Sequence, residues 1–299
     1  MKNLVPVKDN LNNHIEQFIG SLDNVSERTT EEYQKNIRYF MEWYQNSNRN
    51  FDTNILRDYR DELKEKGLSV FTINTYLNSI QRFCDHLFML RLLPVKLDAK
   101  KLKTPSGYCK EPLSKTECRL LLDCIQASDS SDLIKKRDFA IVNLMIRTGL
   151  RLISVQQADI KDIKSKGSSL VLYYLGKGRD MKDDYVVLTE QCARPIFDYL
   201  AVSGHQGALF RPLGNRGKKN ERISLNNLAN LITKYLDRAG IRNKSAHSLR
   251  HTAAQLALDN GATPISIRDM LSHRSFDSTL KYIRATDRLG NAAERRVEI

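Results

Sequence analysis

The chain has 299 residues, of which 41% are hydrophobic, and a formal net charge of +13 from 48 Lys and Arg against 35 Asp and Glu. This length exceeds what one compact core ordinarily fills and predicts two domains, and the positive charge favours a polyanionic partner, with nucleic acid ahead of an anionic membrane surface. No apolar stretch reaches the roughly 18 residues of a membrane-spanning helix, and the N-terminal residues lack the apolar core of a signal peptide.

The first part of the chain predicts a helical N-terminal domain over residues 1–95. Apolar residues at helical spacing predict helices within residues 11–19, 33–44, 52–66 and 73–87. Thr29 and Glu32 have the spacing of a capping box at the start of the second helix. Gly67 is expected to end the third helix, and either Ser69 or Thr72 can cap the fourth.

Residues 96–112 predict an extended basic linker, because lysines alternate there with prolines and a glycine. The lysines are Lys96, Lys100, Lys101, Lys103 and Lys110. Two interpretations remain open for them, plain solvated surface or a linker that lies along DNA.

Residues 113–299 predict a second domain that is mostly helical with a small β-sheet. Ser114 and Glu117 form a second capping-box pattern, and the next helix is expected to end near Gly149. β-rich runs at 170–175 and 185–188 flank a polar turn and predict a hairpin or short sheet. Ser224 caps an amphipathic helix, and the loop before it suits phosphate contact or solvation through Arg211, Arg216, Lys218, Lys219 and Arg222.

The residues with chemical potential gather towards the C-terminus. They are Arg151 after Thr148-Gly149-Leu150, Lys177 in the β-turn, His247-Ser248-Leu249-Arg250-His251, Leu271-Ser272-His273, and Tyr282, the only tyrosine after Tyr235. Each signal alone is weak, because arginines near helix ends and tyrosines on helices are common. Their order and spacing carry the inference.

This set of side chains suits metal-independent chemistry on a phosphodiester. Two guanidinium groups can hold the nonbridging oxygens of one phosphate, histidines can move protons, a lysine can protonate a leaving alkoxide, and a tyrosine can attack. Ionising a free tyrosine at pH 7 costs roughly 4 kcal/mol, which neighbouring cations would lower. The sequence shows no acidic cluster, and its five cysteines form no CxxC pair. We therefore expect no cofactor or metal, and reduced thiols in a cytoplasmic protein.

With these motifs in place, the chain resembles the tyrosine recombinases, or phage integrase family, and especially compact Xer-like and transposon-resolvase-like members. The family pattern is an Arg after Thr-Gly-Leu, a Lys in a β-hairpin turn, His-x-Leu-Arg-His, a Leu-Gly-His box, and a Tyr nine residues after the box histidine. Tyr282 follows His273 by nine residues. The stretch from Leu68 to Phe83 also resembles the family's N-terminal core-binding domain.

The resemblance implies that a helical core-binding domain and a mixed α/β, mostly α, catalytic domain clamp double-stranded DNA. It implies that Tyr282 forms a 3′-phosphotyrosine, that Arg151, Arg250 and His273 hold the phosphate, that Lys177 is the general acid and that His247 is an acid-base group. Such enzymes act as tetramers on paired core sites, in integration, excision or resolution. Residues 283–299 are long enough to pass to a neighbouring subunit.

Three departures from the family pattern leave questions open. Ser154 stands where an acidic residue is usual, so Gln156, Gln157 or Asp159 could orient Arg151 instead. Ser272 replaces the glycine of the box, and Lys182 is a second candidate for the general acid.

Two other functions compete with a recombinase. A type IB topoisomerase uses the same kinds of residues to nick and reseal one duplex. A DNA-binding protein without catalysis is the non-enzymatic alternative.

Overall fold

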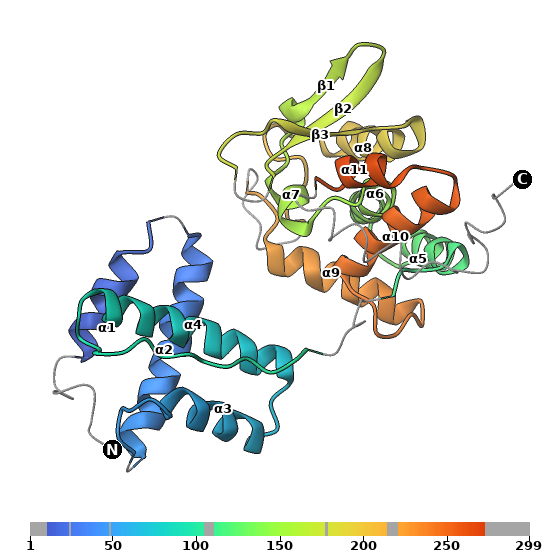
Figure 1. The fold of residues 1–299 in the computed structure, drawn as a ribbon. Coiled ribbons are helices and arrows are strands. Elements are labelled where there is room, and N and C mark those ends of the chain that lie inside the picture. Colours follow the sequence, from blue (N-terminus) through green and yellow to red (C-terminus); the bar gives the residue numbers. More distant parts are fainter. Residues whose placement is uncertain are drawn as a thin grey trace, which may run out of the picture. The chain divides into compact units, whose positions relative to one another are not determined.

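The computed structural model describes residues 11–23, 25–47, 49–104, 111–176, 179–213 and 221–272. The chain divides into two compact units, with the boundary between residues 108 and 109 (Figure 1). Across the described ranges no helix is both long enough and apolar enough to cross a membrane.

The N-terminal unit is helical. It contains α1 (Leu11–Gly20), α2 (Glu27–Asn46), α3 (Ile55–Glu65) and α4 (Val70–Met89). The core between them is rich in aromatic rings, and Phe40 and Tyr59 meet edge to face with ring centroids 4.9 Å apart. The apolar faces read from the sequence therefore form the core of this unit.

The helix starts show which capping predictions hold. Ser69 is the N-cap of α4, because its side chain accepts a hydrogen bond from the Thr72 amide at 3.2 Å. The capping-box prediction at Thr29 and Glu32 is wrong, since α2 begins at Glu27 and Ser26 accepts from the Thr29 amide. The sequence offers two hydroxyl residues three positions apart, and the earlier one is used.

The segment after α4 packs back along that helix. Asn74 hydrogen-bonds both the N–H and the C=O of Leu102, each at 2.9 Å. Gln81 donates to the Leu97 carbonyl and accepts from the Ala99 amide, at 2.7 Å each. Leu97 and Ala99 are buried, whereas the lysines of this stretch point into solvent. The first part of the basic segment therefore belongs to the N-terminal unit.

The C-terminal unit packs helices around α6, which is buried along most of its length. Its elements are α5 (Lys115–Gln126), α6 (Asp132–Thr148), α7 (Leu152–Gln157), a 3₁₀ helix η2 (Ile160–Asp162), β1 (Ile163–Lys166), β2 (Ser169–Tyr174), β3 (Asp184–Val187), α8 (Glu190–Ser203), α9 (Leu225–Arg238), α10 (Ala246–Asp259) and α11 (Pro264–Met270). This mainly helical architecture with a small sheet confirms the predicted fold class.

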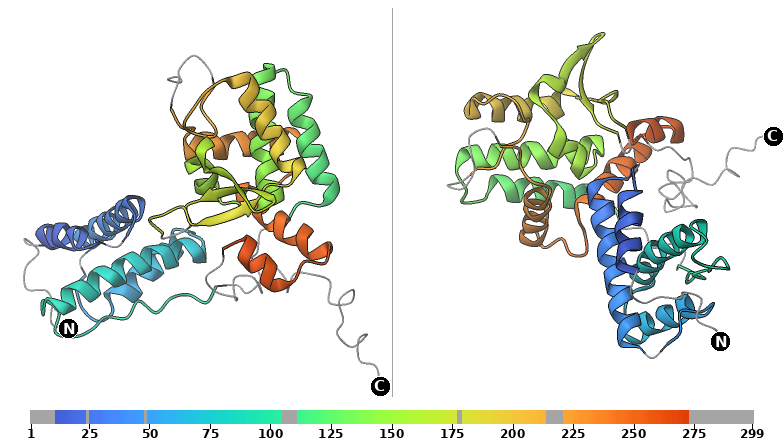
Figure 2. Two further views of the ribbon diagram at one scale, coloured as in Figure 1. Left: turned by 90° about the horizontal axis from the view of Figure 1, so that it is seen from above. Right: turned by 90° about the vertical axis from the view of Figure 1, so that its left-hand side faces the viewer.

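The three strands form an antiparallel sheet in the order β1-β2-β3, and the β1–β2 hairpin extends beyond the helices (Figures 1 and 2). Leu172, Tyr174 and Val186 are buried on its inner face, whereas Tyr185 and Val187 lie exposed on the outer face. The predicted hairpin is thus β2 and β3. The capping box of Ser114 and Glu117 and the Ser224 N-cap are confirmed.

Candidate active site

Arg151 lies at a tight junction between two helices. Gly149 ends α6 in the left-handed conformation, with φ of 66°, and Arg151 is the N-cap residue of α7. A Cβ atom at Gly149 would lie only 2.6 Å from the Leu271 side chain. Glycine is therefore required both by the backbone angle and by close contact with the Leu271-Ser272 turn.

Arg250 connects three of the sequence motifs. It lies on α10, its residue is only 3% exposed, and its guanidinium donates to the Gly149 carbonyl at 2.6 Å and to the Leu271 carbonyl at 2.5 Å. These carbonyls belong to the Thr-Gly-Leu-Arg turn and to the Leu-Ser-His box. A single buried cation thus fixes segments that are far apart in the sequence.

His247 and His251 lie one turn apart on α10, with ring centroids 4.6 Å apart at a steep angle. Burial lowers the pKa of His251 to about 4, with further lowering from His247 and Arg250. His251 is therefore neutral at physiological pH.

Tyr174 lies at the end of β2, and its hydroxyl is 2.6 Å from the hydroxyl of Ser272. Burial raises the pKa of Tyr174, while the Ser272 hydrogen bond and the charges of Arg250 and Arg151 act in the opposite direction. Both arginines are thus close enough to influence the same buried hydroxyl. The sequence motifs did not point to Tyr174, although the serine at the glycine position of the box was a signal.

Lys182 is held in an ion cluster. Its ammonium donates to the Gln157 carbonyl at 2.8 Å, to Asp159 at 2.9 Å and to Asp162 at 2.5 Å. Arg222 also bonds Asp159, at 2.5 Å, and the carbonyls of Gln156 and Ala158. Arg222 therefore makes internal contacts, so the alternative of plain solvation is wrong for this residue, whereas its contact with phosphate stays a prediction.

The same cluster bears on the question of Ser154. Both carboxylate oxygens of Asp159 bind other cations, one Lys182 and the other Arg222, and among the described residues Asp159 makes no hydrogen bond or ion pair with Arg151. Ser154 itself is buried, and its hydroxyl makes a long hydrogen bond of 3.4 Å to the Leu175 carbonyl.

Three of the six candidate residues, Arg151, His247 and Arg250, lie within the described part of the C-terminal unit. Lys177, His273 and Tyr282 lie outside the described residues. Within the ranges that the structure describes, no group of three or more His, Cys, Asp or Glu side chains could hold a metal ion.

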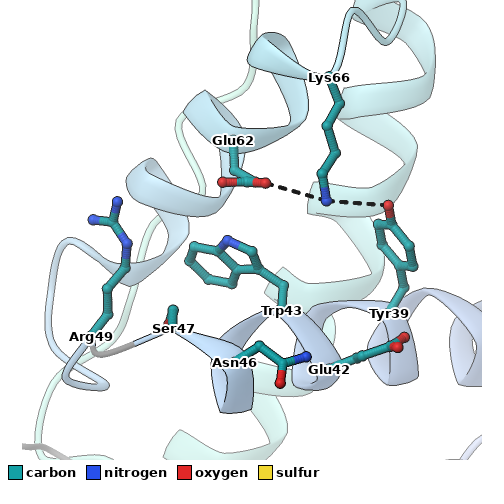
Figure 3. Close-up of a pocket in the computed structure, with 8 residues that line it drawn as sticks. All are labelled: Tyr39, Glu42, Trp43, Asn46, Ser47, Arg49, Glu62 and Lys66. Carbon is teal, nitrogen blue, oxygen red and sulfur yellow. Dashed lines mark hydrogen bonds and ion pairs between the residues drawn. The ribbon is translucent and has the colours of Figure 1, made fainter.

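A separate pocket lies between α2 and α3 in the N-terminal unit (Figure 3). Trp43 and Tyr39 form part of its lining, and Lys66 bridges the Glu62 carboxylate at 3.2 Å and the Tyr39 hydroxyl at 3.4 Å. These contacts tie the end of α3 to α2 and involve none of the candidate catalytic residues.

Comparison with known proteins gives the family context of this geometry. Residues 112–288 match the model of the "Phage integrase family", and residues 15–89 match "Phage integrase, N-terminal SAM-like domain". Tyrosine recombinase XerC of Caldanaerobacter subterraneus is 29% identical over 214 residues, which are 70% of this chain and 58% of that protein. Tyrosine recombinase XerC of Pelotomaculum thermopropionicum is 23% identical over 297 residues, covering 91% of this chain and 94% of that protein.

Solved structures show the same fold. The XerH site-specific recombinase bound to a palindromic difH substrate, in a post-cleavage complex, aligns with a TM-score of 0.75 at 18% identity. The alignment covers 98% of this chain and 90% of that one.

Proposed function

Because the chain belongs to the phage integrase family of tyrosine recombinases, we propose that it is a site-specific recombinase that cleaves and rejoins DNA through a covalent bond to Tyr282. Family members are enzymes that cleave and rejoin DNA. We propose in addition which residues of this chain cleave and rejoin DNA, and that the reaction passes through a covalent intermediate.

The observation that carries the proposal is the position of Arg250. Its guanidinium is buried and bonded to backbone carbonyls of both the Gly149 turn and the Leu271 turn. Arg151 follows the first turn by two residues, and His273 follows the second by two. Such anchoring supports a preorganised phosphate site, since fixed donors stabilise developing charge without reorganisation.

In the proposed reaction, Arg151, Arg250 and His273 hold the nonbridging oxygens of the scissile phosphate. The Tyr282 oxygen attacks phosphorus, and the bond from phosphorus to the 5′ oxygen breaks, leaving a 3′-phosphotyrosine. Lys177 donates a proton to the departing 5′ oxygen, and His247, as an acid-base group, accepts the proton that the Tyr282 hydroxyl loses. The phosphotyrosine retains the bond energy, so rejoining needs neither ATP nor a metal.

The proposed substrate is double-stranded DNA with paired core sites, on which the protein assembles as a tetramer in the cytoplasm. We assign residues 1–95 to core binding, residues 96–112 to the connection between the domains, whose first part packs along α4, and residues 113–299 to catalysis. The biological outcome is integration, excision or resolution of a mobile element, plasmid or chromosome dimer.

The first prediction concerns Tyr282. A core site is selected by binding from inverted-repeat duplexes with randomised arms, and a nick is then placed so that cleavage traps the covalent product. In EDTA, the wild-type protein should give a denaturation-resistant DNA adduct, and Tyr282→Phe should give none while binding the duplex equally well. Tyr185→Phe, on the exposed face of the sheet, is the matched control and should react like the wild type.

An adduct that persists in Tyr282→Phe would mean that another residue is the nucleophile. Activity that requires magnesium would indicate a metal nuclease. Relaxation of supercoiled DNA without strand exchange between two selected sites would indicate a type IB topoisomerase.

A further inference from the structure

Two hydroxyl groups meet beside the proposed phosphate-holding arginines. Tyr174 and Ser272 are 98 residues apart in the sequence, yet their side-chain oxygens lie 2.6 Å apart. Tyr174 is only 3% exposed. The contact links the end of β2, three residues before Lys177, to the turn that immediately precedes His273.

Ser272 has an unusual backbone conformation for its residue type. Its φ is 46°, in the left-handed region that glycine adopts freely and that a side chain makes unfavourable. Its amide donates to the Asp269 carbonyl at 3.0 Å, and its hydroxyl meets Tyr174. A serine in this conformation persists only where its surroundings hold it, and such positions point to a functional constraint.

Arg250 also holds the same turn. The Leu271 carbonyl accepts from the Arg250 guanidinium at 2.5 Å, and the Leu271 side chain fills the space beside Gly149. A displacement of the turn would therefore move a hydrogen-bond partner of Arg250.

From these contacts we propose that Tyr174 and Ser272 are positioning residues, whose hydrogen bond fixes the Leu271-Ser272 turn and thereby the orientation of Arg250. The inference rests on the proposed recombinase function. In this role neither hydroxyl needs to touch the phosphate. Tyr174 acts through Ser272, and the turn acts through its carbonyl on the guanidinium.

The test is a double-mutant cycle on the single-turnover rate of adduct formation with the nicked core-site substrate. Tyr174→Phe removes one hydroxyl at nearly constant volume, and Ser272→Gly removes the other while relieving the backbone. Each should slow cleavage about tenfold, the effect of one lost hydrogen bond, with unchanged affinity for DNA. The double variant should be no slower than either single variant, because both remove the same contact.

Tyr173→Phe is the matched control, since Tyr173 lies on the other face of the same strand and packs against Tyr185; its cleavage rate should equal that of the wild type. The positioning role is overturned if Tyr174→Phe and Ser272→Gly cleave at the wild-type rate, even with lower thermal stability, or if their effects multiply in the double variant. A loss of DNA affinity equal to the loss of rate would also overturn it. A wild-type protein that forms no adduct would instead overturn the proposed function, and the positioning role with it.

Discussion

At the scale of single residues, His251 couples the stability of the C-terminal unit to pH. Burial, followed by the neighbouring His247 and Arg250, lowers its pKa from 6.5 to about 4. In the unfolded chain the imidazole takes up a proton as the pH falls through 6.5, whereas in the folded protein it does so only near pH 4. Stability is therefore fully present above pH 6.5 and is lost as the pH falls towards 4.

We predict that the titration of His251 alone lowers the free energy of unfolding by about 3 kcal/mol between pH 8 and pH 4. His251→Gln, which cannot titrate, should show a correspondingly flatter dependence on pH. Urea denaturation followed by circular dichroism measures it. Fluorescence of Trp43, the single tryptophan, reports the N-terminal unit and should be equal in both proteins. Parallel pH curves for the two proteins would contradict the assignment.

Individual site residues differ in how far the sequence reveals them. Arg250 could be predicted because its spacing from two histidines is a local signal. The contact between Tyr174 and Ser272 could not, since it joins residues 98 positions apart with no shared periodicity. Ser154 could be predicted only in part. Its departure from the family pattern is visible in the sequence, but its burial beside the Leu175 carbonyl is a tertiary fact.

At the scale of elements, the helices were predictable where an apolar stripe and a cap coincide, as in the helix that follows Ser224. Strand β1 was not predicted. Its sequence, Ile163-Lys164-Ser165-Lys166, has one apolar residue, and three of its four side chains are exposed. Only pairing with β2 makes this edge segment a strand, and pairing of this kind leaves little trace in local composition.

The two candidate general acids, Lys177 and Lys182, both lie in the connection between β2 and β3, and the contacts of Lys182 show which of them is the better candidate. All three ammonium donors of Lys182 are matched by Gln157, Asp159 and Asp162. Burial opposes the charged form of Lys182, but the two carboxylates outweigh it and raise the pKa of this lysine. A lysine that two carboxylates keep charged is a poor proton donor, and Lys182 instead stabilises the fold by binding Asp159 and Asp162. Lys177 is therefore our proposed general acid.

We predict opposite effects for the two lysines. Lys182→Met should lower the unfolding free energy by about 2 kcal/mol, because it leaves two partly buried carboxylates without this cation, and should slow cleavage only modestly. Lys177→Met should leave stability unchanged and slow cleavage at least about 100-fold, as expected for loss of a general acid. Urea denaturation and single-turnover cleavage measure the two effects.

Chemical rescue provides the control for this comparison. A substrate with sulfur in place of the 5′ bridging oxygen leaves as a thiolate, which needs no protonation. This substrate should restore the rate of Lys177→Met and should not restore any rate lost in Lys182→Met. Rescue of the Lys182 variant alone would reverse the assignment.

At the scale of the whole molecule, the excess of 13 positive charges is its most general property. Part of it lies on the segment that Asn74 and Gln81 hold against α4, where Lys100, Lys101 and Lys103 are exposed. Because hydrogen bonds hold the backbone of this segment against α4, its lysines extend from fixed positions along the helix. This arrangement suits contact with successive phosphates.

The last prediction follows from counterion release. The logarithm of DNA affinity should fall linearly with the logarithm of salt concentration, and each phosphate contact should contribute about 0.9 to the slope. Changing Lys100, Lys101 and Lys103 together to glutamine should therefore reduce the slope by about 2 to 3. The matched control changes Lys64, Lys66 and Lys136, which already pair with Asp61, Glu62 and Asp132. Fluorescence anisotropy of the selected core site between 50 and 200 mM salt, roughly the range in which such slopes are read, measures both variants. Equal reductions in the two would show that net charge alone, and not the ordered segment, determines the salt dependence.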